Sequence, residues 1–188
     1  MRSLNLRRSR ALTGILAGAT LVIAFGGSTV VAAPKVDPGA DLAAVRQATN
    51  KYKDLNAAIA DGYVPFYVCA EEPGIGTMGQ HYVKLSLVGD PNEDPLQPEA
   101  LVYEPTPNGG VKLVAAEWVV FASVWQDAFG ATTPTILGQP MLFRPAGNRY
   151  GLPDFYERHA WLWQGNPDGM FADWNPNVTC RGTGDNGG

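Results

Sequence analysis

The sequence lacks the short motifs that identify common nucleotide-binding and hydrolytic enzymes. Its glycine-rich stretch, EEPGIGTMG at 71–79, has neither the strand–GxGxxG–helix context of a dinucleotide site nor the lysine of a P-loop. No GxSxG element surrounds a serine, and no HExxH spacing is present. These absences exclude a motif-marked nucleotide site or nucleophile, so any chemistry has to be inferred from individual side chains.

The sequence also lacks an apolar run of the roughly 20 residues that a transmembrane helix needs. The N-terminal apolar stretch at 11–25 is interrupted by glycine, follows four arginines and no acid, and precedes small residues. This order is typical of a secretory signal peptide, with cleavage expected after Ala33 or one residue earlier. We therefore predict a signal peptide at 1–33, a linker at 34–40, a single domain at 41–180 and a flexible tail at 181–188. The protein would be secreted or extracytoplasmic, with no membrane contact after cleavage.

Positive charge is scarce in the predicted mature chain. The whole sequence has 14 Lys and Arg against 18 Asp and Glu, and four of the arginines belong to the predicted signal peptide. Ten basic residues against 18 acidic ones leave a net charge near −8. Such a chain lacks the excess of basic residues that binds nucleic acid or an anionic membrane surface, and we expect neither partner. A composition of 45% hydrophobic and 17% charged residues excludes disorder, collagen and coiled coil.

Cysteine is limited to Cys69 and Cys180. In an oxidising compartment an even pair most simply forms a disulfide, and the alternative is two buried free thiols. The disulfide would close a loop of about 110 residues, which the chain-entropy model values at up to about 4–5 kcal/mol. It would also leave no thiol for covalent catalysis.

Hydrophobic periodicity predicts one helix followed by strands. Between Asp41, a plausible N-cap, and the Asp61-Gly62 stop, apolar residues recur at three- and four-residue spacing, as in an amphipathic helix. The period then changes to two, and TPNGG carries an Asn-Gly turn signal. The predicted strands are 63–69 (at an edge), 80–88, 100–104, 111–123, 141–144 and 155–163. We therefore predict an α+β domain in which one N-terminal amphipathic helix packs on a curved antiparallel sheet.

Three ionisable side chains stand out because each lies in an apolar predicted strand. They are His81, Glu117 and His159. Burying a carboxylate unpaired costs several kcal/mol, so Glu117 requires a histidine, an arginine or a metal as partner. If the three strands are neighbours, the three side chains converge under the helix. Alternation assigns Leu85 and Leu87 to the face of His81, Leu113 to the face of Glu117, and Glu157, Trp161 and Trp163 to the face of His159.

This convergence permits three interpretations. Two histidines and one carboxylate suit a divalent metal such as zinc or non-haem iron, with open positions for water or substrate. The same residues suit metal-free acid/base work in which Glu117 orients a histidine. They also suit a structural polar cluster. We expect an exported protein that binds a small ligand or metal ion in a pocket between sheet and helix, with a metal-assisted or acid/base enzyme as the alternative.

Aromatic residues suggest a second kind of site. All five tryptophans lie between Trp118 and Trp174, and Trp161 and Trp163 share one predicted strand face. Together with Tyr82 they are candidates to stack on a sugar or an apolar ligand, which would make the protein a glycan-binding or envelope-interaction module. The alternative is that these rings pack in the core.

Four segments of the sequence are similar to those of a known group of proteins: GQHYVKLSL, PEALVYEP, RHAWLWQGNPDGMF and NPNVTC. They resemble a family of exported bacterial proteins of unestablished activity. That family pairs a Gly-x-His-Tyr strand with a later His-x-Trp-x-Trp segment, followed by Asn-Pro-x-Gly-x-Phe and Asn-Pro-x-Val-x-Cys. The similarity covers roughly 48–180 and includes His81, His159 and Cys180. It implies secretion and a single domain, and it carries over no activity.

Overall fold

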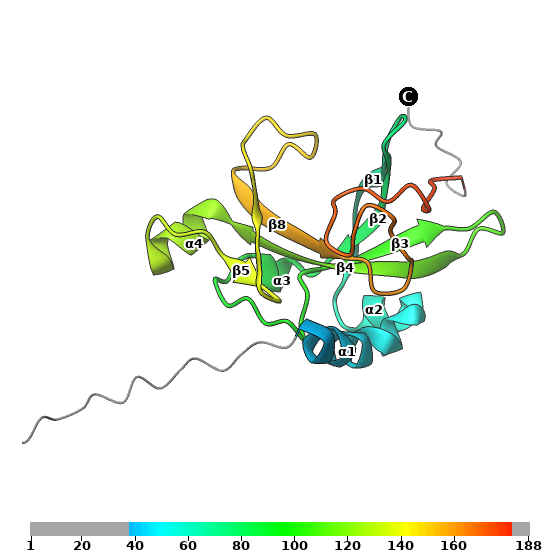
Figure 1. The fold of residues 1–188 in the computed structure, drawn as a ribbon, viewed down its shortest axis with the longest axis horizontal. Coiled ribbons are helices and arrows are strands. Elements are labelled where there is room, and N and C mark those ends of the chain that lie inside the picture. Colours follow the sequence, from blue (N-terminus) through cyan, green and yellow to red (C-terminus); the bar gives the residue numbers. More distant parts are fainter. Residues whose placement is uncertain (1–37, 182–188) are drawn as a thin grey trace, which may run out of the picture. The chain divides into compact units, whose positions relative to one another are not determined.

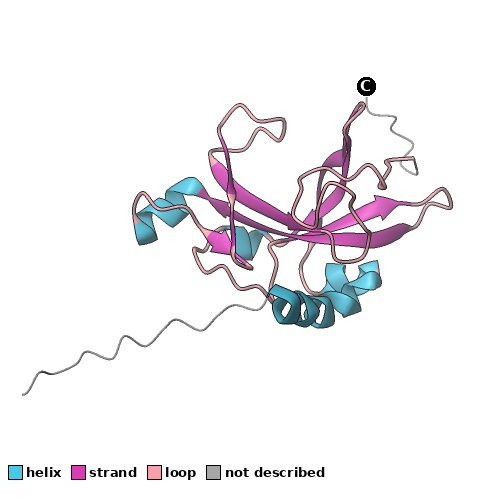
Figure 2. Cartoon of the chain, in the orientation of Figure 1, coloured by secondary structure: helices cyan, strands magenta, loops and turns pink. Residues whose placement is uncertain are grey.

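The computed structural model describes residues 38–181. The predicted signal peptide, most of the predicted linker and residues 182–188 lie outside these residues. Figure 2 shows helices at the start of the described chain, followed by strands, long loops and two further short helices. The elements are α1 (Pro38–Thr49), the 3-10 helix η1 (Asn50–Lys53), α2 (Leu55–Ala60), β1 (Val64–Glu72), β2 (Gly76–Val83), α3 (Leu85–Val88), β3 (Ala100–Pro105), β4 (Val111–Phe121), α4 (Ala122–Phe129), β5 (Thr135–Ile136), β6 (Gln139–Pro140), β7 (Leu142–Arg144) and β8 (Phe155–Ala160).

Six strands form one antiparallel sheet in the order β1-β2-β3-β4-β8-β7, and β5 and β6 form a separate small hairpin. The large sheet is curled, as Figure 1 shows. The predicted α+β class with a curved antiparallel sheet is therefore confirmed. The Asn-Gly turn joins β3 to β4 as predicted, with the Thr106 amide donating to the Gly110 carbonyl. Residues 113–120 of β4 are buried without a break, because both faces of the central strands are covered.

The helices α1, η1 and α2 cover one face of this sheet (Figure 1). Val45 of α1 is fully buried in a core cluster that contains Trp118. The single helix predicted from Asp41 is interrupted, because Asp54 adopts an extended backbone and its side chain accepts a hydrogen bond from the Asn56 amide. Such an N-cap starts a new helix. None of the described helices is long and apolar enough to cross a membrane.

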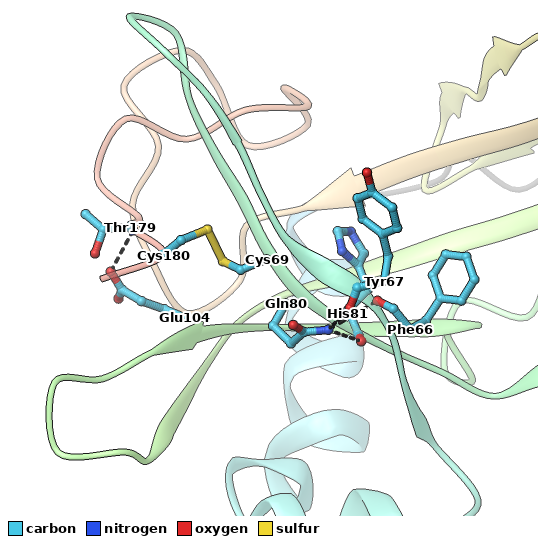
Figure 3. The surroundings of a disulfide bond; sticks show 8 residues. All are labelled: Phe66, Tyr67, Cys69, Gln80, His81, Glu104, Thr179 and Cys180. Atoms are coloured by element: carbon cyan, nitrogen blue, oxygen red, sulfur yellow. Dashed lines mark hydrogen bonds between the residues drawn. A yellow bond between two sulfur atoms is a disulfide. The ribbon is translucent and has the colours of Figure 1, made fainter. Parts of the chain in front are cut away.

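The C-terminal segment, residues 161–180, crosses the opposite face of the sheet (orange to red in Figure 1). A β-bridge between Thr77 and Asn175 attaches it to β2. Its end is bound to β1 by the predicted Cys69–Cys180 disulfide, which is confirmed, and the Thr179 amide donates to Glu104 of β3 (Figure 3). The two faces of the sheet therefore have different coverings, helices on one and irregular chain on the other.

Several strand boundaries were predicted wrongly. The predicted strand 80–88 ends at Val83, where the Lys84 amide donates to the Glu99 carbonyl, and Leu85 and Leu87 belong to the short helix α3. The stretch 71–79, predicted as a loop, is a β-hairpin turn with its flanking strand residues. The predicted strand 111–123 ends at Phe121 and leads into α4, which the strand interpretation missed.

Candidate functional site

Strand register places the three candidate residues on one face of the sheet. Glu117 of β4 lies directly opposite His159 of β8, and Ala100 of β3 lies opposite Glu117 on the other side. His81 of β2 pairs with Val102 of β3. Directly paired residues point to the same face, and i and i+2 in one strand do too. His81 can reach Glu117 across β3 because the intervening Ala100 has a small side chain and the sheet curls.

The three side chains meet at their polar ends. The Nε2 atoms of His81 and His159 are 3.5 Å apart. His81 Nε2 lies 3.3 Å from Glu117 Oε2, and His159 Nε2 lies 3.6 Å from Glu117 Oε1. The three side chains are only 6%, 0% and 4% exposed for His81, His159 and Glu117, respectively. The predicted convergence is therefore confirmed, and the three residues are one of two groups in the described chain whose donor atoms could hold a metal ion.

The predicted position under the helix is wrong. Trp118 and Val120, which alternate with Glu117 and Val119 along β4, lie in the core cluster that contains Val45 of α1. Glu117 therefore points to the other face, beneath the C-terminal segment and the loop 145–154. The pattern of alternation fixes which residues share a face, and it leaves open which face a helix covers.

One predicted face-mate of Glu117 also lies elsewhere. Leu113 was assigned to the face of Glu117, but it clusters with Tyr103 on the helix side. The β3–β4 register shifts between Val102 and Tyr103, so that Val102 pairs with Ala115 while Tyr103 pairs with Leu113. This irregularity is a β-bulge, which inserts one extra residue and reverses the alternation on one side of it.

Burial controls the protonation of the cluster. Burial lowers the pKa of His81 to about 4, and it lowers the pKa of His159 well below its ordinary value, with further lowering from the neighbouring His81 and Arg144. Burial also raises the pKa of Glu117 well above its ordinary value, and the nearby carboxylate of Glu157 adds to that. Both imidazoles are therefore neutral at pH 7. Their contacts with Glu117 are not ion pairs, and each ring carries a nitrogen lone pair.

A second charged group adjoins the first and already contains a cation. Arg144 of β7 donates through Nε to Glu157 Oε1 at 2.5 Å, and its Nη2 donates to Asp173 of the C-terminal segment. Glu157, His159 and Asp173 also have donor atoms close enough to hold a metal ion. The guanidinium of Arg144 binds both of these carboxylates, however. The two groups thus differ, because no positive side chain of the described residues contacts Glu117.

A pocket with mostly apolar walls reaches the cluster from the side. Its empty volume, counted with the space open to solvent, is about 490 Å³. Its inner polar lining consists of His81, Glu117 and Glu157. Tyr150 of the loop 145–154 lines it as well; the Tyr150 ring lies 6.3 Å from that of His81, and the hydroxyl contacts Met78 Sδ at 3.0 Å. The same loop joins the two edges of the curled sheet, since Arg149 contacts Glu72 of β1.

The aromatic candidates do not share a surface. The predicted strand 155–163 ends at Ala160, so Trp161 and Trp163 lie in the C-terminal segment rather than on one strand face. Trp161 is buried, stacks on His159 and donates from Nε1 to the Ala172 carbonyl. Trp163 lies beneath the Lys53 ammonium on the helix side. Tyr82 packs edge-on against Tyr103, also on the helix side of the sheet.

Sequence reasoning missed the contributions of Arg144, Tyr150 and Asp173. Glu157 was recognised as a neighbour of His159 because two residues along a strand share a face. Arg144 ends the short predicted strand 141–144 and Asp173 lies near the C-terminus, and a charged residue at either place is ordinarily exposed to solvent. The only available signal was an excess of buried carboxylates, which requires a cation nearby.

The chain matches no protein-family model, no curated protein and no solved structure at a significant level.

Proposed function

We propose that the protein binds a divalent transition-metal ion through His81, Glu117 and His159, beside a pocket that admits a small ligand. The spacing of the donor atoms carries this proposal. The two imidazole Nε2 atoms are 3.5 Å apart, that of His81 lies 3.3 Å from Glu117 Oε2, and that of His159 lies 3.6 Å from Glu117 Oε1. Two ligand atoms that each lie about 2.1 Å from a tetrahedral zinc ion are about 3.4 Å apart, so separations of this size suit a shared ion bound by both imidazoles and the carboxylate.

The charges of the side chains around the site favour a divalent cation. The combined cluster holds three carboxylates, Glu117, Glu157 and Asp173, and one cationic side chain, Arg144. Both histidines are neutral, so the ionised cluster would carry a net charge of −2. Buried charge is stable only when it is balanced by a partner. A divalent cation balances it, whereas without the ion Glu117 has to hold a proton.

The open side of the cluster supports ligand binding rather than a closed structural site. Three protein ligands leave a fourth tetrahedral position free, as in catalytic zinc sites. His81 and Glu117 line the pocket, while His159 is fully buried behind them. We infer that the free position is directed at the pocket, so that a ligand or substrate can reach it.

Metal-free acid/base catalysis is less well supported. A general base that works near pH 7 needs a pKa near that value. The pKa of His81 is lowered to about 4 by burial, which makes it a weak base. Metal-assisted catalysis stays as the enzyme alternative. The glycan-binding alternative has no open face in the described residues on which Trp161, Trp163 and Tyr82 lie together.

We also propose that the protein acts outside the cytoplasm. The Cys69–Cys180 disulfide supports an oxidising environment, where such bonds persist. The predicted signal peptide would deliver it there, and zinc or iron ions would be taken up after export.

Metal titration of the purified protein tests the proposal. The protein is stripped with a chelator, and zinc uptake is measured by calorimetry and by elemental analysis after desalting. We expect one equivalent of zinc per chain for the wild type, and none for Glu117→Gln or His81→Gln. Removing one of three ligands leaves a buried two-ligand set that cannot compete with water.

Glu99→Gln is the matched control. Glu99 is another buried glutamate, immediately before β3, and it is not part of the cluster. This variant should retain one equivalent of zinc. Absence of uptake by the wild type at saturating zinc, or equal uptake by Glu117→Gln, would overturn the proposal.

A further inference from the structure

The pocket beside the cluster has two chemically distinct parts. Its walls are apolar and include Phe66, Val83, Val119, Leu152 and Phe155, with Leu85 of α3 at the solvent side, 65% exposed. Its inner end is formed by His81, Glu117 and Glu157. Pockets of this kind bind molecules with an apolar body and one polar group, because the polar end fixes the orientation.

The charges at the inner end select the polar group. With the proposed divalent ion in place, two positive charges plus Arg144 balance the three carboxylates Glu117, Glu157 and Asp173. A carboxylate ligand would add an uncompensated negative charge next to Glu157, and an ammonium ligand would be repelled by the ion. A neutral head group adds no charge.

Hydrogen bonding narrows the choice further. Glu157 has one oxygen bound to Arg144 and lies close enough to Glu117 to interact with its carboxyl group. An ionised carboxylate only accepts hydrogen bonds. A hydroxyl group fits both neighbours, because its oxygen lone pair can bind the ion while its proton is donated to Glu157. An ether or ester oxygen supplies only the first of these interactions.

We propose that the pocket binds small, neutral apolar alcohols, with the hydroxyl oxygen on the metal and the hydroxyl proton on Glu157. This inference rests on the proposed metal site. The alkyl chain lies along the walls formed by Val83, Val119 and Phe155, and Tyr150 covers it from the loop side. Each methylene group of the alcohol removes further apolar surface from water.

The test is a binding series on the full-length protein with zinc stoichiometry measured on the same samples. The probes are 1-butanol, 1-hexanol and 1-octanol, with octanoate and octylammonium as charged counterparts and methyl hexyl ether as the donor-free analogue. We expect binding of the alcohols to tighten about fourfold per methylene group. Octanoate and octylammonium should bind at least tenfold more weakly than 1-octanol. Methyl hexyl ether should bind at least tenfold more weakly than 1-hexanol.

Two variants separate the pocket from the metal. Leu152→Trp narrows the pocket and should weaken 1-octanol binding at least tenfold while zinc uptake stays at one equivalent, which also verifies the fold. Leu96→Trp, at an exposed leucine outside the pocket, should change neither quantity. Zinc uptake without alcohol binding, or equal binding of octanoate, would overturn the alcohol assignment and leave the metal proposal standing. Alcohol binding of equal strength with and without zinc would overturn the role of the ion in it.

Discussion

Glu99 provides a quantitative test of how burial in this fold changes the ionisation of a carboxyl group. The residue precedes β3, is only 2% exposed, and its Oε2 accepts a hydrogen bond from the Val119 amide. Burial, assisted by the nearby Glu93 carboxylate, raises the pKa of Glu99 from an ordinary value of 4.5 to about 9. The folded protein therefore retains a proton on Glu99 that the unfolded chain releases at neutral pH.

The sign and size of the effect follow from these two values. The contribution of protonated Glu99 to the free energy of unfolding is fully present below pH 4.5, and it is lost as the pH rises toward 9. Each pH unit in this window removes about 1.4 kcal/mol from the free energy of unfolding. Between pH 5 and pH 7.5 the loss assigned to Glu99 is about 3 kcal/mol.

Glu99→Gln removes the proton equilibrium and keeps an oxygen to accept from the Val119 amide. Urea denaturation at pH 5 and pH 7.5 should show the variant gaining about 3 kcal/mol on the wild type between the two conditions. Glu71→Gln, at an exposed glutamate of β1, is the control and should show no such gain. The reasoning would be refuted by a difference between variant and wild type that is the same at both pH values.

Further predictions concern the disulfide and one glycine. The double variant Cys69→Ala/Cys180→Ala should lose about 4–5 kcal/mol of unfolding free energy in urea denaturation, because the bond closes a 111-residue separation; an unchanged urea midpoint would contradict this. Gly79→Ala should lose more than 2 kcal/mol, since φ is +101° and a Cβ atom would lie 2.8 Å from the Tyr103 carbonyl oxygen. Gly109→Ala, with φ of +77° and open space, should lose clearly less, and equal losses would contradict a steric cause.

The sequence predicted the parts of the fold that depend on local chemistry. The Asn-Gly turn between β3 and β4, the α+β class and the Cys69–Cys180 pairing all follow from residue types and their order. Alternation was also enough to bring Glu117 and His159 to one face, because both lie in regular parts of adjacent strands. The convergence with His81 additionally required the strand order, which was an assumption.

The same reasoning from residue pattern failed where the backbone is irregular. The bulge near Val114 reverses the alternation within β4, and nothing in VKLVAAEWVVF marks its position. The α4 helix had a readable signal, since Ala122, Trp125 and Phe129 follow three- and four-residue spacing, but the preceding apolar strand obscured it. The face covered by the helices depends on packing between distant segments, as does the arrival of Arg144 and Asp173 at the site.

The position of the C-terminal segment at the end of the chain implies an order in which the parts of the fold form. All six strands of the large sheet precede it in the chain, yet it delivers Asp173 and one half of the disulfide. A chain that emerges with its N-terminus first can pair its strands while Cys69 still awaits a partner far downstream. During that interval the histidine side of the sheet is uncovered and hydrated. The proposed ion site would therefore be enclosed only in the finished protein, after its three ligands have been brought together by the sheet.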